Sequence, residues 1–490
     1  MTLLNDPGLL LWLVPVLPAL GAAMAVTVPG NDRLTLRGIG MLTLLGVLGI
    51  GALLVVDGWD VIAAGGIVSS PLPWLPALRL TSTSTPALLT MLVVAPLALR
   101  AGAPRVRDGM AAYVVAILLQ VGVTAMALLL QDLAWAMGAA LVSSVPGFAL
   151  VALFGGPERG TVTWRAAALW VTVDGAALAI VVGGAGPWPP EVVAIALLGP
   201  GLVRLAAGPH GLWALPFFEM APVASASTAA AVSAPMGAVL LWRGAVAADQ
   251  VGALDAVAVA AAVALGGAAA IGAVLVVVER DLRRIAAHWG GLLGSIVALS
   301  VVAAVMDGRA VSDSLLLSCH VGLSTSFLLV VIEAIERRLE TRRVNHLAGL
   351  ATLAPVLAGV LPLAVLLLAG APGPGTAPTL WSVLAALVAD SSVGVAGAAC
   401  VAAVLVGAVG AAGVMIRVVT PQPRKHAHFI RMSPMQTIRL VTPLGAMLLA
   451  ALATAPLRTL PPPPLPSSPS LPSSPSSPSS LAARTEGGRP

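Results

Sequence analysis

Six ionisable side chains interrupt otherwise apolar stretches of this sequence and are its clearest candidates for chemistry. An ionisable group is costly inside a membrane, so such a residue usually faces the protein interior and belongs to an ion or proton path. No nucleophile with its base and no hydrolytic carboxylate pair is evident. The residue types therefore indicate proton or ion movement, and the six are Asp132, Asp174, Arg204, Glu219, His320 and Asp390.

Two of these groups, Asp174 and Arg204, fall in adjacent predicted helices. Each needs a partner or water if it lies at membrane depth. Their charges are opposite, so they could meet that need by pairing with each other. Two interpretations stay open at this point, a structural ion pair and a part of a proton path.

His320 opens the run "HVGLSTS", in which three Ser or Thr side chains follow it. These hydroxyl groups suit a hydrogen-bonded polar seam between helices. The sequence leaves open whether His320 is a relay histidine or a lone histidine packed against another helix. Asp132 differs, because it follows Gln131 at a predicted turn and is expected to be a solvated turn residue.

Glu219 lies in the short, Pro-containing and moderately apolar segment "GPHGLWALPFFEMAP" (208–222). Irregular backbone at membrane depth is tolerated only where protein covers it or where it lines a water-filled cavity. We therefore expect a loop or a broken helix here, close to a hydrophilic path.

Other chemistries lack their usual motifs. Cys319 and Cys400 both fall in apolar runs and are expected to be small packing residues rather than a disulfide or a metal pair. No zinc, haem or iron–sulfur spacing occurs, and no phosphate-cradling loop. We expect no metal, no cofactor and no catalytic centre in this chain.

The composition indicates a polytopic membrane protein. Of 490 residues, 58% are hydrophobic and 10% charged, and the mean hydropathy is +0.98. Soluble domains are about 45–50% apolar and about 25% charged. The basic balance does not indicate nucleic-acid binding, because the arginines lie in loops that flank apolar segments. The expected surroundings are therefore the lipid bilayer and other membrane proteins.

Fourteen segments are apolar and long enough to be counted as membrane helices, which need about 20 residues. The 382–416 stretch is long enough to contain a kink or a surface helix. The first segment lacks the features of a removed signal peptide. The segments are approximately 8–28, 36–56, 86–101, 111–130, 134–154, 166–184, 191–207, 221–243, 251–278, 285–305, 313–333, 347–369, 382–416 and 437–457.

The basic residues predict the orientation, because loops on the cytoplasmic side are enriched in Lys and Arg. With the N-terminus outside, the inside loops include Arg280 to Arg284 and Arg337 to Arg343. The outside loops receive only Arg79, Arg243, Arg309 and Arg458, besides two in the tail. Residues 1–460 are thus predicted to form one transmembrane domain, and the Pro/Ser-rich stretch 461–490 a disordered tail.

Several motifs occur in an order that resembles one known family across most of residues 70–457. The sequence resembles the antiporter-like subunits of respiratory complex I, in particular subunit M (chain 4) of NADH-quinone oxidoreductase. The motifs are "WLPALRLTSTSTPALL" after residue 73, "FGGPERG" (154–160), "ERDLRRIAAHWG" (279–290), "CHVGLSTS" with "ERRLETRR" (319–343), "LLLAGAPGPGT" (366–376) and the closing "RMSPMQTIRLVTPLGAM" (431–447).

The resemblance implies an all-α fold of about fourteen transmembrane helices, some of them broken, and an ancestral role in moving protons along a central row of charged residues. Position by position, His320 matches a histidine of that row. Arg204 replaces a lysine, and a guanidinium stays protonated in proteins. Four further positions of the row fall on residues that cannot titrate: Leu141, Pro235, Leu293 and Leu380.

The resulting hypothesis is a non-redox membrane-arm subunit of an NADH:quinone oxidoreductase-like complex, in a bacterial plasma membrane, from whose proton path most charges are lost. The remaining path candidates are His320, Arg204, Asp174 and Glu219. The alternatives are a subunit of a related cation/proton antiporter or membrane-bound hydrogenase complex, and a structural paralogue that conducts no protons. In each case the expected partners are other membrane-arm subunits.

Overall fold

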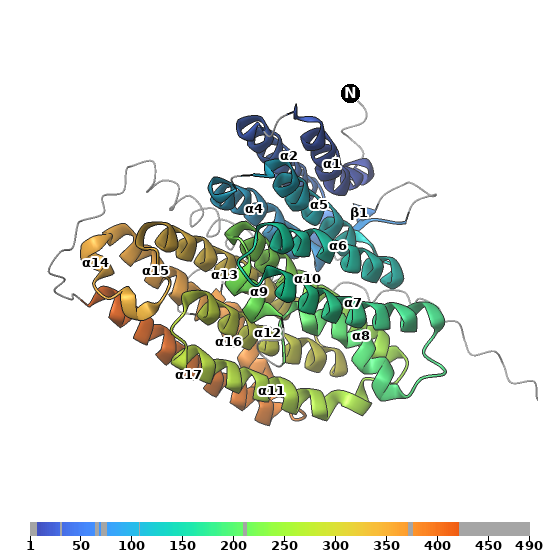
Figure 1. Cartoon of the computed structure of the whole chain (residues 1–490). Coiled ribbons are helices and arrows are strands. Elements are labelled where there is room, and N and C mark those ends of the chain that lie inside the picture. The colour runs from blue at the N-terminus through green and yellow to red at the C-terminus, as the bar shows by residue number, and fades with distance from the viewer. Residues whose placement is uncertain are drawn as a thin grey trace, which may run out of the picture.

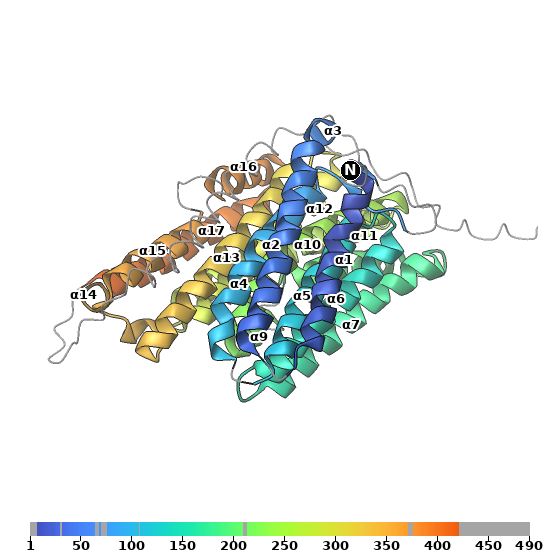
Figure 2. The same cartoon turned by 90° about the horizontal axis from the view of Figure 1, so that it is seen from above.

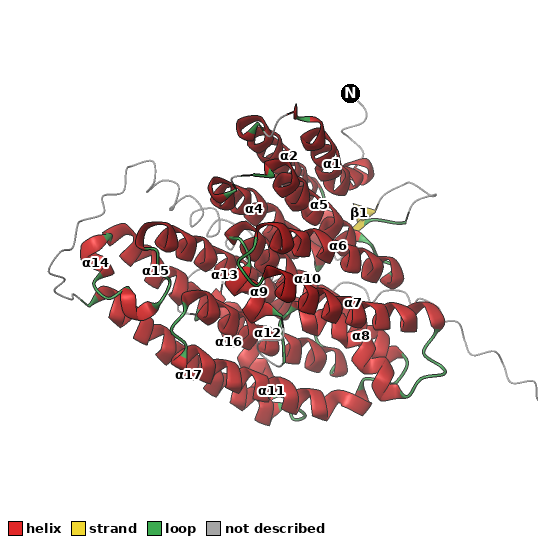
Figure 3. Cartoon of the chain, in the orientation of Figure 1, coloured by secondary structure: helices red, strands yellow, loops and turns green. Residues whose placement is uncertain are grey.

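The computed structural model describes residues 7–29, 32–63, 68–69, 76–106, 108–208, 213–370 and 376–420. In these ranges the chain is almost entirely helical (Figure 3). The helices in the first half are α1 (Pro7–Thr27), α2 (Arg33–Asp57), α3 (Trp59–Ala63), α4 (Ser84–Gly102), α5 (Met110–Leu129), α6 (Leu133–Phe154), α7 (Arg159–Gly183), α8 (Pro190–Arg204) and α9 (Ala214–Met220).

The second half of the chain contains eight further helices in the described residues. They are α10 (Val223–Gln250), α11 (Asp255–Val278), α12 (Leu282–Met306), α13 (Ser312–Leu339), α14 (Leu350–Leu353), α15 (Pro355–Leu368), α16 (Thr376–Ala389) and α17 (Gly394–Val419). Two-residue strands β1 (Val68–Ser69) and β2 (Arg79–Leu80) form an antiparallel pair, the one sheet among the described residues.

Helices α10, α12 and α13 form the centre of the bundle, and α13 is the most completely buried of the long helices in the described residues. The N-terminal group α1, α2, α4, α5 and α6 packs on one side of this centre, while α11 and α17 lie together on the other (Figure 1). Most of the helices run roughly parallel to one another (Figure 2). The exposed faces of α2, α7, α11 and α17 carry large apolar side chains, as lipid-facing helices require.

Eleven helices in the described ranges are long and apolar enough to cross a membrane. The polytopic all-α prediction is therefore confirmed, whereas the count of fourteen is not. Three predicted segments have different bounds. The 347–369 segment divides into α14 and α15, the 382–416 segment divides into α16 and α17, and the 221–243 segment extends to Gln250 as α10. Segment 437–457 and the tail 461–490 lie outside the described residues.

Helices α8 and α15 are each too short to span a bilayer alone. At 15 residues α8 is about 22 Å long, and at 14 residues α15 is about 21 Å, against a hydrocarbon core of about 30 Å. Each is followed by a second short helix, α9 and α16 respectively. In the segment 208–222, where a loop or a broken helix was expected, the structure has the short helix α9. Gly370 ends α15 with a φ of +71°, a conformation that favours glycine.

Candidate functional site

Asp174 on α7 and Arg204 at the end of α8 form a buried bidentate ion pair. The two guanidinium Nη atoms donate to the two carboxylate oxygens, both at 2.6 Å. Both residues are about 1% exposed. The pairing that the sequence allowed is thus present, and it joins α7 to the break at the end of α8.

Arg204 has further partners on two other sides. Its Nη1 donates to the Pro200 carbonyl at 3.1 Å, and its Nη2 donates to the Ala140 carbonyl of α6 at 2.9 Å. The guanidinium also lies over the ring of Trp170, 4.7 Å from its centroid, in a cation–π contact. The arginine therefore holds α6, α7 and α8 together as a structural hub.

His320 lies on α13, where the helix faces the second broken pair. Its Nδ1 is 3.1 Å from the hydroxyl of Thr379 on α16, and both residues are buried. Leu380 is the next residue on α16 and is also buried, against Gly370. His320 thus contacts Thr379, the residue next to Leu380, which the resemblance assigns to the row.

Helix α10 lies between Arg204 and the His320 helix. A Cβ built on Gly237 of α10 would be 2.9 Å from the Cβ of Arg204, so α10 packs directly on this residue. On α13, a Cβ built on Gly322 would be 3.3 Å from Cδ of Pro235. Pro235, which has no backbone N–H, therefore stands in the helix that separates the two polar groups.

The other apolar positions of the row surround the same region. Leu293 is fully buried on α12. Leu141 on α6 is half-buried and directly follows Ala140, whose carbonyl accepts from Arg204. Leu141, Leu293, Leu380 and Pro235, the positions that the resemblance assigns to the row, contribute no titratable group.

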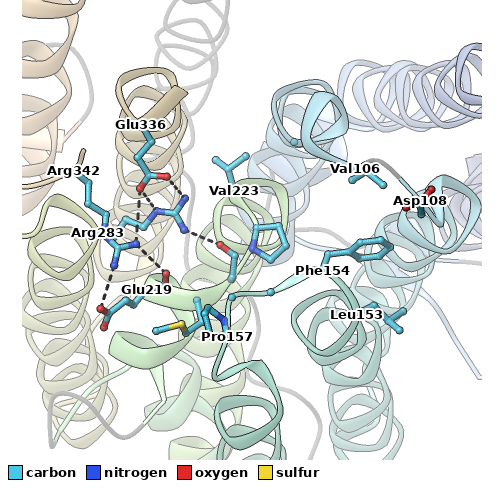
Figure 4. A pocket seen from close by; sticks show the side chains of 16 residues that line it. Val106, Asp108, Leu153, Phe154, Pro157, Glu219, Val223, Arg283, Glu336 and Arg342 are labelled. Carbon is cyan, nitrogen blue, oxygen red and sulfur yellow. Dashed lines mark hydrogen bonds and ion pairs between the residues drawn. The ribbon is translucent and has the colours of Figure 1, made fainter. Parts of the chain in front are cut away.

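Glu219 lies in a different group of charged side chains. Its side chain, 28% exposed, is at the end of α9, and its Oε1 is 3.2 Å from Nη2 of Arg342. Both residues line a pocket of about 560 Å³ at one end of the bundle (Figure 4). Glu219 is thus part of an ion-pair cluster at the pocket.

The cluster around this pocket is organised by Arg283 at the start of α12. Its Nε is 2.8 Å from Glu336 and its Nη2 is 3.4 Å from Glu333, both on α13. The same guanidinium donates to the carbonyls of Phe218 at 3.3 Å and Ala221 at 2.8 Å. Figure 4 shows Arg283, Glu336, Arg342 and Glu219 gathered on one side of the pocket, opposite Asp108 and Leu153.

Several basic residues of the predicted inside loops meet at this end. Arg37 donates to the Ala103 carbonyl at 2.9 Å, and Arg337 donates to the carbonyl of Ala101. Arg342 also pairs with Asp281. Since the donors and acceptors of these contacts come from four separate predicted loops, the loops share one face of the bundle.

The sequence interpretation missed Glu333 and Glu336 on α13, at the last residue of the predicted segment 313–333 and just beyond it. It also placed Arg243 in an outside loop, and this was wrong, because α10 continues for two turns beyond that residue. Arg243 is buried, and it donates to the carbonyls of Leu130 at 2.7 Å and Leu128 at 3.1 Å. These hydrogen bonds satisfy two carbonyl groups at the end of α5 that have no partner within the helix.

The two remaining candidates lie at helix ends. Asp132 caps α6, with its carboxylate accepting from the Trp135 N–H at 3.0 Å, and it is exposed as expected.

Asp390 lies in the turn between α16 and α17 and pairs with Arg309. Burial acts to raise the pKa of Asp390, but hydrogen bonds from the Ser392 hydroxyl and from the backbone N–H groups of Ser392 and Val393 outweigh it and lower the pKa to about 2.

Metal binding finds no support in the described ranges, where no group of three or more His, Cys, Asp or Glu side chains is arranged to hold an ion. Cys319 and Cys400 are free and buried on different helices. Both behave as the packing residues expected from the sequence.

No protein-family model matches this sequence, and no curated protein matches it. Solved structures are similar in fold. A chain of respiratory complex I from Thermus thermophilus with bound NADH has 17% identity and a TM-score of 0.74, over 92% of this chain and 98% of that one.

Two other assemblies contain chains of equally similar fold. The Mrp complex from Dietzia sp. DQ12-45-1b gives 17% identity and a TM-score of 0.75 over 92% of this chain and 96% of that one. A chain of the membrane-bound sulfane sulfur reductase, an archaeal respiratory membrane complex, has 14% identity and a TM-score of 0.76, over 91% of this chain and 95% of that one. The chain therefore has the fold of the antiporter-like membrane subunits that its sequence resembles.

Proposed function

We propose that this chain is a membrane-arm subunit of an NADH:quinone oxidoreductase-like respiratory complex. The observation that carries the proposal is the fold similarity to a complex I chain over 92% of this chain and 98% of that one. Such a subunit binds other membrane subunits through its exposed apolar helices. Electron transfer and quinone reduction belong to the partners in this proposal, and this chain holds no cofactor.

The second part of the proposal is that the chain does not relay protons along a row of charged side chains. Arg204 is held by Asp174 and by two carbonyl groups, and a guanidinium does not release its proton in proteins. Leu293, Leu141 and Leu380 cannot accept a proton. His320 alone in the row can exchange one, and Pro235 stands in the helix between it and Arg204.

The proposed location is a bacterial plasma membrane with the N-terminus outside. Basic side chains from three predicted inside loops meet at one end of the bundle, which supports a single cytoplasmic face there. The pocket of about 560 Å³ opens at that end, next to Glu219 and Arg342.

Assembly can be tested by purifying the full-length chain, tagged in its native host, in a mild detergent. We expect it to migrate in a large complex that oxidises NADH and reduces a quinone. If the tagged chain runs alone, or in a complex that carries no redox cofactor, the proposal of a respiratory subunit is wrong.

A second candidate is a subunit of a cation/proton antiporter complex. The TM-score of 0.75 with a chain of the Mrp complex favours it as much as the value of 0.74 favours complex I. Inverted membrane vesicles distinguish the two. An antiporter complex exchanges cations for protons in the absence of NADH and quinone, whereas the first candidate does not.

A further inference from the structure

A small internal cavity of about 20 Å³ lies beside the buried ion pair, between α5, α6, α7, α9 and α10. Its polar lining consists of Gln120 on α5, Ser143 and Ser144 on α6, and Ser233 on α10, and the Trp170 ring closes the α7 side. One water molecule needs about 10–15 Å³. The cavity is therefore large enough for water and too small for a metabolite.

Two buried polar atoms in this lining have no hydrogen-bond partner among the described residues. They are the Oε1 acceptor of Gln120 and the Nε1–H donor of Trp170, whose residues are both about 5% exposed. A buried polar group without a partner is costly. A molecule that both donates and accepts would satisfy the two atoms at once, and buried waters usually make two to four such bonds.

The cavity is connected to the ion pair by hydrogen bonds. Ser143 lines the cavity and donates to the Ala140 carbonyl at 2.7 Å. The same carbonyl accepts from Arg204 at 2.9 Å. Since the Ser143 hydroxyl donates its hydrogen to the backbone, its lone pairs remain available to accept a hydrogen bond from a molecule in the cavity. Trp170 provides a second link, because the Arg204 guanidinium lies over its ring.

The glycine at position 147 makes room for the Gln120 amide. A Cβ built on Gly147 would be 3.1 Å from Nε2 of Gln120, tighter than most such contacts. The amide thus rests against the α6 backbone at the edge of the cavity.

We propose that this cavity is a binding site for internal water, held by Gln120, Trp170 and Ser143, and that it hydrates the polar network around Arg204 and Asp174. The site depends on the local packing alone and not on which complex contains the chain. It also does not require proton conduction.

X-ray radiolytic footprinting of the full-length protein in nanodiscs tests this site, because radicals formed from a bound water oxidise the side chains around it even when they are buried. Met236 lines the cavity, whereas Met91 and Met137 do not. All three are about 1% exposed and therefore serve as matched probes. We expect Met236 to be oxidised several-fold faster than the other two. Equal rates for the three methionines would overturn the proposal without the use of any variant.

Two variants then assign the water to Gln120. Gln120→Leu removes the acceptor and keeps the volume, and it should reduce the oxidation of Met236 to the rate of Met137. The matched control is Thr124→Val, which removes a fully buried hydroxyl one turn further along α5 that does not line the cavity. This control should leave the Met236 rate unchanged. A Met236 rate that Gln120→Leu does not change in a folded protein would contradict the role of Gln120.

Discussion

Asp174 and Arg204 are buried together, so neither charge can be removed without leaving the other uncompensated. Breaking a buried pair by removing one partner typically costs about 3–5 kcal/mol, whereas replacing both partners by apolar residues is often tolerated. We expect Asp174→Leu and Arg204→Met each to lower the unfolding temperature strongly. The double variant should regain much of the loss.

The measurement is thermal unfolding of all four proteins in the same detergent, analysed as a double-mutant cycle. Additive losses would show that the two side chains do not interact. The carbonyl groups of Pro200 and Ala140 lose their donor both in Arg204→Met and in the double variant. This loss therefore cancels in the cycle and does not contribute to the coupling energy between Asp174 and Arg204.

Asp390 should make the stability of the protein depend on pH. It lies near the end of α12 that is opposite the Arg283 cluster. Its pKa is lowered from an ordinary value of 3.8 to about 2. The stability that this carboxylate contributes is therefore present above about pH 4 and lost as the pH falls towards 2. Asp390→Asn should lower the unfolding temperature at pH 7, and the difference from the wild type should shrink as the pH falls through this window.

Unfolding temperatures of both proteins between pH 2 and pH 7 check this expectation. Asp249→Asn, at an exposed carboxylate in the last turn of α10, is the control and should change little at any pH. A constant difference for Asp390→Asn down to pH 2 would refute the lowered pKa.

At the residue scale, the pairing of Asp174 with Arg204 could be predicted, because two opposite charges in adjacent helices need partners. The contact of His320 with Thr379 could not, since 59 residues and a broken helix separate them. Arg243 was misplaced because the apolar pattern weakens at the arginine, although the helix continues for two turns.

Among the elements, the contact between α8 and α10 decides where Arg204 lies. A Cβ built on Gly244 of α10 would be 2.1 Å from the Leu197 carbonyl of α8. Since backbone cannot move aside cheaply, Gly244→Ala should separate the two helices and lower the unfolding temperature. Gly267→Ala on α11 is the matched control, because nothing lies within 4 Å of its built Cβ.

Outside such a contact, replacing a helix-interior glycine by alanine stabilises a helix by about 1 kcal/mol. The Gly267→Ala variant should therefore be at least as stable as the wild type, and only Gly244→Ala should lose stability. If the two variants behave alike in thermal unfolding, the close approach of α8 and α10 is not a determinant of the fold.

At the element scale, hydropathy located almost every long helix but not the divisions at 354 and 390–393, because short apolar helices joined by small residues read as one segment. The proline-containing stretch 208–222 was recognisable as a break, since it combines Pro and Gly with lower hydropathy. The bounds of α10 and α16 could not be read, because tertiary packing rather than composition fixes them.

For the whole molecule, the fold class followed from composition and motif order, and it agrees with the solved respiratory and Mrp chains. The gathering of the inside loops at one end was indicated by the charge pattern, because basic residues cluster on one side of a membrane protein. The pocket beside Glu219 was not predictable, since it requires α4, α6, α9, α12 and α13 to meet.

The proposal for the whole molecule is a respiratory membrane subunit without a side-chain proton relay. Its most direct test is the number of protons moved per electron by the complete complex in proteoliposomes, with the wild type compared with His320→Ala. The variant removes the one exchangeable group of the row and leaves the Asp174–Arg204 pair in place. We predict an unchanged ratio in an intact complex, and a clear fall in that ratio would contradict the proposal.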